Sequence, residues 1–206
     1  MAEVEAMNGT KVKKPGYFGK FEGMITGTSE RRLPPVESWH PPYCGDIGLK
    51  IRGDGVWLYR DGPICRSSLV ELFASVLRKD ADGRTYLVTP EEKVDVAVED
   101  APFLAVDMEV RGAGRAQQIV FRTNVDDVVI CGPEHPLRFA EQQPGGGLKP
   151  YVLVRGGLEA LLTRALLHDL VALAVEEERA DKRVAGVWSG GSFFAFAAVD
   201  ARLSAP

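Results

Sequence analysis

Apolar and polar residues alternate in short runs along the chain, and this period of two predicts β-strands. The first two such runs occupy residues 47–52 and 56–60. Between them stands Gly53-Asp54-Gly55, and an Asp-Gly pair between two apolar runs is typical of a hairpin turn. The pattern therefore predicts an antiparallel hairpin near the start of the folded part.

The apolar residues between Leu69 and Leu77 recur at helical spacing instead, which predicts an α-helix. Ser68, followed three residues later by Glu71, matches a capping box at the start of this helix. Alternation returns at residues 85–89, where we expect a strand that ends before a proline.

The middle of the chain is predicted to be a meander of antiparallel strands. Residues 93–110 alternate on either side of residues 99–102, whose proline cannot donate to a sheet, so this stretch is expected to be the loop of a hairpin. A second hairpin turns at residues 112–114 and returns through residues 117–123. A further turn leads into a strand at residues 128–131.

The C-terminal part is predicted to hold a second helix between short strands. Residues 151–154 form the first strand, and the Leu- and Ala-rich residues 158–174 favour a helix. The charged residues 176–183 are expected to be a solvated loop. Two closing strands follow, at residues 186–188 and 193–196.

Two segments of similar pattern indicate an internal duplication. Residues 56–60 and 151–155 each end in arginine; Asp61-Gly62 follows the first and Gly156-Gly157 the second, and a predicted helix comes after each. The fold class expected is α+β, with two duplicated strand-strand-helix-strand units at residues 33–101 and 102–200. Residues 1–32 show no sustained period and are predicted to be a disordered tail. Because strand-glycine-helix joints are common in α+β chains, chance similarity remains the alternative.

Composition argues against nucleic-acid-binding, membrane-spanning and disulfide-rich proteins. The chain carries 25 basic and 29 acidic residues, a formal charge of -4, so it has no overall field for nucleic acid or anionic lipid. No apolar run approaches the length that spans a bilayer. Its three cysteines, Cys44, Cys65 and Cys131, show no metal or disulfide spacing. We therefore expect a bacterial cytoplasmic protein with buried or free thiols and no membrane span.

The segment Arg155-Gly156-Gly157 is the first candidate for chemistry. A strand that runs through arginine and glycine into a helix N-terminus presents free backbone N–H groups beside a cation, an arrangement that binds phosphate or carboxylate. Arg164 and His168 share one face of the same predicted helix and could extend the site. The alternative is an ordinary turn whose arginines pair with surface acids.

Two further groups are candidates. Glu99 and Asp100 would face one ligand if they lay in a loop, but a hairpin tip with an Asx turn at Asp100 is the alternative. Residues 122–124, Arg-Thr-Asn, combine a cation with two short hydrogen-bonding side chains at a strand end. The sequence lacks a nucleophile elbow, a P-loop, a dinucleotide fingerprint and a metal-ligand pattern, so neither a cofactor nor a metal is expected.

A series of blocks runs in order through residues 33–196: PPVESWHPPYCGDI, DGVWLYRDGPICRSSLVELFASVLR, YLVTPEEKV, VEDAPFLAVDMEV, FRTNVDD, PYVLVRGGLEALLTRALLHDLV and GVWSGGSFF. This series resembles the proteobacterial family called domain of unknown function 1285. The resemblance implies a two-part α+β fold built by duplication, with a C-terminal half superficially like a pleckstrin-homology barrel and helix. It also implies a nucleotide-like ligand between the halves and a role in signalling.

Together these observations lead to three hypotheses. The first is a non-enzymatic sensor or regulatory protein that holds a small anionic ligand, with nucleotides among the candidates, between its halves. The second is an interaction adaptor whose pleckstrin-like half binds a protein. The third is a hydrolase or transferase that uses Glu99 or Asp100 with a raised pKa. The predicted ligand-binding residues are Arg66, Glu99, Asp100, Arg122, Thr123, Asn124, Arg155, Gly156, Gly157 and Arg164.

Overall fold

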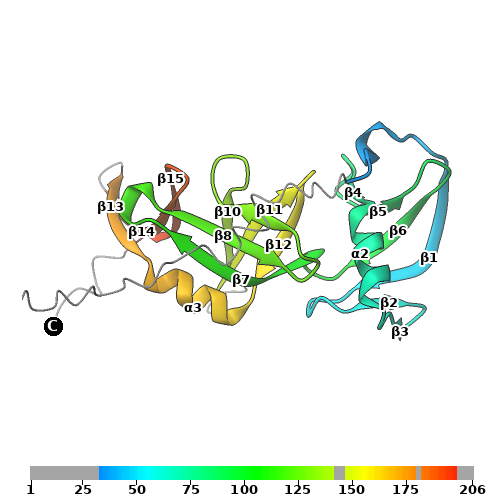
Figure 1. Cartoon of the computed structure of the whole chain (residues 1–206), viewed down its shortest axis with the longest axis horizontal. Coiled ribbons are helices and arrows are strands. Elements are labelled where there is room, and N and C mark those ends of the chain that lie inside the picture. Colours follow the sequence, from blue (N-terminus) through cyan, green and yellow to red (C-terminus); the bar gives the residue numbers. More distant parts are fainter. Residues whose placement is uncertain (1–32, 142–146, 180–181, 199–206) are drawn as a thin grey trace, which may run out of the picture.

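The computed structural model describes residues 33–141, 147–179 and 182–198, and the tail predicted at residues 1–32 lies outside them. Within these residues, two six-stranded sheets and one three-stranded sheet, with two α-helices, follow one another along the long axis of the molecule (Figure 1). The fold is α+β, as predicted, although strands predominate.

The first sheet occupies the N-terminal half, where a short 3-10 helix, η1 (Val36–Ser38), precedes it. Its strand order is β3-β2-β1-β6-β5-β4, and the central pair, β1 and β6, is parallel. Helix α2 connects β3 to β4. The bounds are β1 (Tyr43–Ile51), β2 (Trp57–Tyr59), β3 (Gly62–Pro63), α2 (Ser67–Ser75), β4 (Leu77–Lys79), β5 (Thr85–Val88) and β6 (Lys93–Val98).

The second sheet follows the order β10-β11-β12-β7-β8-β9, and its central pair, β7 and β12, is also parallel. Helix α3 comes after the sixth strand and leads to a three-stranded antiparallel sheet. The bounds are β7 (Phe103–Arg111), η2 (Gly114–Ala116), β8 (Gln118–Thr123), β9 (Val128–Ile130), β10 (Leu137–Glu141), β11 (Leu148–Arg155), β12 (Leu158–Leu162), α3 (Arg164–Ala172), β13 (Val175–Arg179), β14 (Lys182–Ser189) and β15 (Ser192–Ala198).

The two six-stranded sheets repeat one topology. Each consists of two three-stranded meanders, and the first strand of one meander lies parallel to the last strand of the other. The helix differs, because α2 joins the two meanders whereas α3 follows the sixth strand. The segments matched in the sequence, β2 and β11, are the second strand of one unit and the fifth of the other, so they are not equivalent. The repeat is therefore a six-stranded unit, and the prediction of a strand-strand-helix-strand repeat is wrong.

The hairpin of β1 and β2 and helix α2 confirm two predictions. Helix α2 buries Ala74, and its Phe73 ring packs 6.2 Å from the ring of Trp57. The predicted capping box is wrong, because the N-cap residue is Arg66 and no side chain caps the helix. The start of this helix is stabilised by packing of its apolar face and not by a serine at position 68.

The helix predicted at residues 158–174 is wrong over its first part. Residues 158–162 form strand β12, in which Leu158, Ala160 and Leu162 are buried and the residues between them are half-buried. Helix α3 begins only at Arg164. A run of leucine and alanine fits both the helical period of about 3.6 residues and the strand period of two. Here the pairing with β7 and β11 selects the strand.

Two predicted loops have other structures. Residues 99–102 do not close a hairpin, because β6 pairs with β1 and β5 while β7 pairs with β12 and β8. They are the connection between the two sheets. Residues 176–183 supply β13 and the start of β14, which pair across the register from Val175–Gly186 to Arg179–Lys182. Cross-strand pairing forms this ribbon although most of its side chains are exposed.

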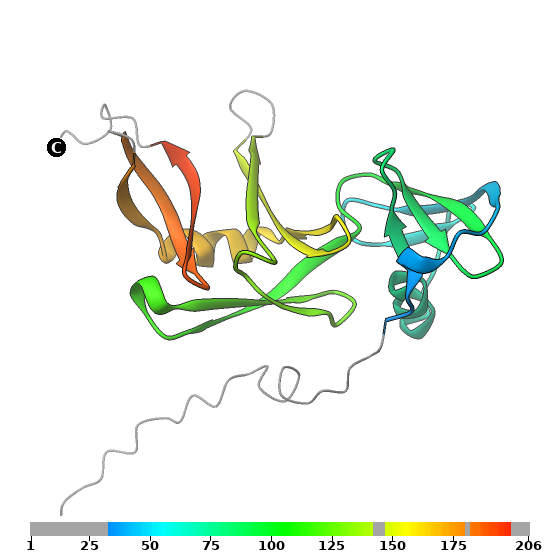
Figure 2. The same ribbon diagram turned by 90° about the horizontal axis from the view of Figure 1, so that it is seen from above.

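The core of the C-terminal half lies between the second sheet, helix α3 and the three-stranded sheet (Figure 2). Phe103, Phe121 and Ile119 from the sheet, Leu170 from α3 and Val187 from β14 are all fully buried. The β14–β15 turn approaches the segment after β9 closely, because a Cβ at Gly190 would lie 2.9 Å from the Cys131 carbonyl oxygen. The buried Ser189 hydroxyl donates to the same carbonyl at 2.7 Å.

This close approach leads to a test with a matched control in the same turn. Gly190 and Gly191 both have positive φ, 55° and 75°, but no atom lies within 4 Å of the position that a Cβ at Gly191 would occupy. Gly191→Ala is expected to lower the free energy of unfolding by about 1–2 kcal/mol, because alanine is strained in the left-handed conformation. Gly190→Ala is expected to lower the free energy of unfolding by roughly 1–3 kcal/mol more, because its Cβ meets backbone atoms. Urea denaturation of both variants measures this, and equal losses would contradict the packing described.

Candidate functional site

The adjacent acids Glu99 and Asp100 lie in the connection between the two sheets and bind opposite halves. Glu99 forms an ion pair with Lys50 at 2.6 Å and accepts the Gly53 N–H at 2.9 Å, both in the N-terminal half. Asp100 accepts from Lys149 at 2.6 Å and from the Tyr151 hydroxyl at 2.7 Å, both on β11. The pair therefore anchors each end of the connection to its own sheet.

The electrostatics of both acids follow from these partners. The hydrogen bond from Lys50 is the main cause that lowers the pKa of Glu99, with help from the Gly53 N–H. Burial opposes ionisation of Asp100, but the hydrogen bonds from Lys149 and Tyr151 outweigh it and the pKa is lowered. Burial and the same Asp100 carboxylate raise the pKa of Tyr151 to about 12. Both acids are thus stabilised as carboxylates.

Arg155, at the end of β11, connects the two halves. Its guanidinium donates to the Asp127 carboxylate in the turn between β8 and β9, and to the Ala74 carbonyl at the end of α2 at 2.9 Å. The same group lies 4.9 Å from the centre of the buried Phe103 ring. The Arg155 and Asp127 side chains are only 22% and 23% exposed. The guanidinium is therefore turned inward and part of it is already bound.

The Arg-Thr-Asn segment builds the turn that presents Asp127. The buried Thr123 Oγ1 accepts the N–H groups of Val125 and Asp127 at 3.3 and 3.1 Å. Asn124 accepts the Leu104 N–H through its side chain at 3.0 Å and donates its own N–H to the Leu104 carbonyl at 2.8 Å. Arg122 forms ion pairs with Asp126 and Asp107 at 2.8 and 3.5 Å. These three residues hold the turn in place and so position Asp127, which accepts a hydrogen bond from Arg155.

Gly156 and Gly157 form the turn between β11 and β12, with φ of 48° and 74°. A Cβ at Gly156 would lie 3.0 Å from Glu37 Oε1, and one at Gly157 would lie 3.6 Å from the Lys79 side chain. The absence of side chains here lets both residues of the N-terminal half approach. Because β12 follows directly, the helix N-terminus predicted at this point is not present.

A cavity of about 500 Å³ lies beside this turn, between the two halves. Its polar wall includes Arg155, Gly156, Lys79, Glu37 and Ser75. Apolar walls come from the segment 33–36 and from Leu77 and Leu158. Among the described residues no carboxylate forms an ion pair with the exposed Lys79. The cavity therefore has an ammonium group without a carboxylate partner among the described residues, next to a partly bound guanidinium.

The predicted site residues divide into three sets. Arg155 and Gly156 line the cavity, and Gly157 adjoins it through Lys79. Glu99, Asp100 and residues 122–124 support the junction of the halves without lining the cavity. Arg66 and Arg164 are exposed at the N-terminal ends of α2 and α3, and neither lines it.

Sequence patterns did not indicate Lys79, Glu37 or Asp127. Lys79 is the last residue of β4 and looks like an ordinary charged strand end, and Glu37 lies in the short η1. Asp127 stood in a recognised turn, but only its contact with Arg155 shows its role. The residues converge through tertiary packing of segments that lie far apart in sequence, and no local spacing could have identified them.

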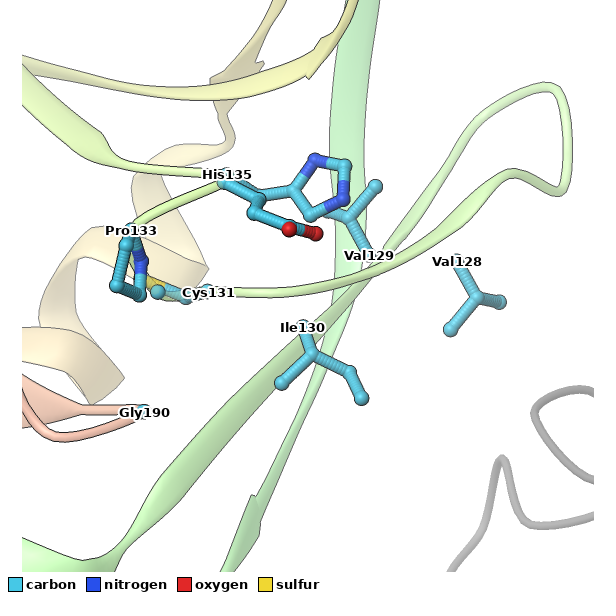
Figure 3. A pocket seen from close by; sticks show the side chains of 9 residues that line it. Val128, Val129, Ile130, Cys131, Pro133, His135 and Gly190 are labelled. Carbon is cyan, nitrogen blue, oxygen red and sulfur yellow. The ribbon is translucent and has the colours of Figure 1, made fainter.

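A second cavity of about 620 Å³ lies at β9 (Figure 3). Residues 128–135 and the Gly190 turn line it, with Val128, Ile130 and Pro133 as apolar walls. The His135 Nδ1 is 3.0 Å from the Leu153 carbonyl oxygen, so this nitrogen carries a proton and donates. Cys131 is buried, and burial raises the pKa of its thiol to about 12.

Within the described ranges, no cluster of three or more His, Cys, Asp or Glu side chains is arranged to bind a metal ion. The three cysteines are free thiols, as predicted, with Cys44 and Cys65 exposed. No helix in the same part of the chain has the length and apolar character needed to cross a bilayer.

Comparison with known proteins identifies one family. Residues 34–101 match the domain of unknown function DUF1285, N-terminal domain, and residues 102–196 match the C-terminal domain of the protein of unknown function DUF1285. The crystal structure of a DUF1285 family protein from Silicibacter pomeroyi DSS-3 is 46% identical, with a TM-score of 0.76, over 81% of this chain and 88% of that one. One from Shewanella baltica OS155 is 28% identical, with a TM-score of 0.48, over 61% and 91%. No curated protein matches.

The contact of Arg155 with Asp127 can be measured by a double-mutant cycle. Arg155→Met keeps the length of the side chain but leaves Asp127 partly buried without its cation. It is expected to lower the free energy of unfolding by about 2–4 kcal/mol. Asp127→Asn in the Arg155→Met background should recover part of this loss. Additive losses of the two substitutions in guanidinium denaturation would show that the groups do not interact.

The lowered pKa of Asp100 predicts a dependence of stability on pH. A carboxyl whose pKa is lower in the folded protein stabilises it above the ordinary value of 3.8 and loses this effect as pH falls through the folded value. The free energy of unfolding should therefore drop more between pH 5 and pH 3 in the native protein than in Asp100→Asn. Thermal unfolding at each pH measures this, with the exposed Asp61→Asn as the matched control, and identical pH profiles for native protein and Asp100→Asn would refute it.

Proposed function

This chain is a member of the DUF1285 family, whose descriptions assign no function, and we propose that it is a non-enzymatic sensor that binds a small anionic ligand between its two halves. The observation that carries the proposal is the cavity of about 500 Å³ beside Arg155. It combines the Lys79 ammonium group, which pairs with no carboxylate in the described part of the chain, with the N–H groups of the guanidinium that Asp127 and Ala74 leave free.

The polar groups of the cavity support an anion in two ways. Arg155 retains N–H donors in a fixed orientation, because its other contacts hold the guanidinium plane in place. Lys79 supplies a charge on a flexible side chain whose stem packs near Gly157. A phosphate or carboxylate that reaches both would replace water around two cations without breaking an existing ion pair.

Glu37 limits which anions fit. Its carboxylate lies beside Gly156 in the same cavity and would repel a ligand that is negative throughout. A ligand that also carries hydroxyl or amino groups would donate to Glu37 while its anionic group binds the two cations. Nucleotides have this mixed chemistry, and the accessible apolar wall at residues 33–36 suits the face of a base.

The location of the cavity supports a regulatory role. Its walls come from both halves, so a ligand would contact the end of α2 and the β11–β12 turn at once. Any difference in the arrangement of the halves would change those contacts, and the ligand would favour the arrangement it binds best. This is the physical basis of a sensor in signalling.

A hydrolase or transferase that uses Glu99 or Asp100 has less support. General acid chemistry near neutral pH requires a raised carboxyl pKa, whereas the partners of both acids lower it. Both side chains are also bound to lysines. Neither acid lines the cavity beside Arg155.

An interaction adaptor remains a second candidate, because the C-terminal half has a free sheet edge at β9 next to a second cavity. With this candidate goes the proposal that the C-terminal half, with its six-stranded sheet and α3, is similar to a pleckstrin-homology domain. An immobilised protein that captures a defined partner through β9, with no response to small ligands, would favour it.

The ligand proposal is tested by calorimetric titration of the native protein with a panel of nucleoside mono-, di- and triphosphates. We expect binding by at least one of them, and Lys79→Gln should weaken it about tenfold by removing one charge contact. Lys182→Gln, an exposed lysine on β14 outside the cavity wall, is the matched control and should bind normally.

Two further variants make the test specific. Glu37→Gln removes the repelling carboxylate, so it should tighten the binding of inorganic phosphate and weaken nucleotides that donate to it. Arg155→Ala should abolish binding but also destabilise the fold, so its folding is checked by thermal unfolding first. No heat on addition of any nucleotide, or equal affinity in Lys79→Gln and Lys182→Gln, would overturn the proposal.

A further inference from the structure

One wall of the cavity beside Arg155 is a short segment, residues 33–37, at the edge of the first sheet. Its helix η1 lies beside β4, the edge strand of that sheet (Figure 1). Val36 and Trp39 pack partly against the core, but no residue of η1 is fully buried. Apolar burial therefore gives this wall a weak hold, and its polar contacts decide where it lies.

Arg78, the middle residue of β4, supplies two of these contacts. Its Nη1 donates to the Val36 carbonyl at 2.7 Å and to the Trp39 carbonyl at 2.8 Å. Glu37 lies between these two carbonyls in the chain, so one guanidinium nitrogen fixes both ends of the turn that carries the Glu37 carboxylate. Arg78 itself does not line the cavity, because it faces the side of β4 opposite to Lys79.

The Arg78 guanidinium is fixed in turn. Arg78 is only 8% exposed, and its guanidinium donates to both carboxylate oxygens of Asp80, at 2.6 and 3.3 Å. Lys93 donates to the same carboxylate at 3.0 Å. The hydrogen bond from Arg78 is the main cause that lowers the pKa of Asp80, so this carboxylate keeps its charge at neutral pH. A guanidinium held in this way is a rigid anchor for the segment.

The cations of the cavity belong to other elements. Lys79 is the last residue of β4, and Arg155 is the last residue of β11. Glu37, in contrast, reaches the cavity from the segment, and its Oε1 lies 3.0 Å from the position that a Cβ at Gly156 would occupy. A ligand would therefore meet its charge partners on the two strands and its other contacts on residues 33–37.

We propose that Arg78 is the positioning residue that sets the ligand specificity of this cavity. With the segment held, Glu37 accepts from a hydroxyl or amino group of a nucleotide whose phosphate binds Lys79 and Arg155. With the segment released, that acceptor and the apolar wall are lost, and the two cations bind small anions without discrimination. This inference rests on the proposed function, because it assigns selectivity to the same cavity.

The test compares the native protein with Arg78→Lys in calorimetric titrations with nucleoside mono-, di- and triphosphates and with inorganic phosphate. Lysine keeps the charge beside Asp80, but an ammonium group lacks the fork that reaches the carboxylate and both carbonyls at once. The dissociation constant of the tightest nucleotide should rise about tenfold. That of phosphate should not rise, because phosphate needs only the two cations. A role of Arg78 in stability alone would leave the ratio of the two constants unchanged.

Amide hydrogen exchange, followed by NMR, measures the hold on the segment without any ligand. The amides of Ser38 and Trp39 donate to carbonyls within the turn. In Arg78→Lys they should exchange about tenfold faster or more, while the amide of the buried Val88 in β5 keeps its rate.

Two further variants complete the design. Asp80→Asn leaves Arg78 in place but offers it one acceptor oxygen instead of two, so both effects should appear in the same direction and smaller, about threefold. This variant carries the test if Arg78→Lys does not fold. Arg84→Lys is the matched control, because Arg84 pairs with Asp95 of the same sheet at 2.7 Å but lies in the β4–β5 turn, outside the cavity wall. It should keep the native selectivity and exchange rates.

The inference fails, and the proposed function stands, if the native protein binds nucleotides and both Arg78→Lys and Asp80→Asn bind them equally well. It also fails if these variants lose phosphate as fully as nucleotides. Unchanged exchange at Ser38 and Trp39 would show that Arg78 does not hold the segment. If the native protein binds no nucleotide, the proposed function and the specificity assigned to Arg78 are both refuted.

Discussion

The guanidinium of Arg155 lies between the two halves of the chain, where it binds Asp127 of the C-terminal half and the Ala74 carbonyl of the N-terminal half. The guanidinium lies over the ring of Phe103, the first residue of β7, and this contact fixes the orientation of the guanidinium plane. The connection at Glu99 and Asp100 is anchored on each side of the same junction. The relation of the two sheets thus rests on a few charged contacts that burial strengthens.

The same contacts explain why a cavity exists at the junction. The β11–β12 turn consists of two glycines, so it leaves room for Glu37 and Lys79 instead of filling the space with side chains. A polar junction of this kind lowers the stability of the folded protein little when water fills it. A ligand of matching charge that replaces the water would stabilise the junction. The structural role of Arg155 and its proposed binding role are compatible because the guanidinium has more donors than its two partners use.

Local patterns in the sequence predicted the elements whose stability is local. The β1–β2 hairpin, helix α2, the β7–β8 hairpin and the β14–β15 hairpin were predicted because their turns or helical spacing are specific. For residues 158–162 the pattern predicts a helix, because leucine and alanine suit both periods, and the parallel partner β7 that decides between them lies far away in sequence. The same limit applies to residues 99–102, since a connection between sheets and a hairpin loop have similar composition. At the site, Arg155 and its glycines were found by their residue types, whereas Lys79 and Asp127 required the fold.

The parallel pairing of first and last strands has a consequence for synthesis. In each sheet the central contact joins segments separated by a whole unit, β1 with β6 and β7 with β12, so the contact order of both units is high. The first sheet draws all its strands from residues 43–98, and its closure needs nothing from the second. It can assemble as it leaves the ribosome, and its completed α2 then offers the Ala74 carbonyl to an arginine that is translated much later.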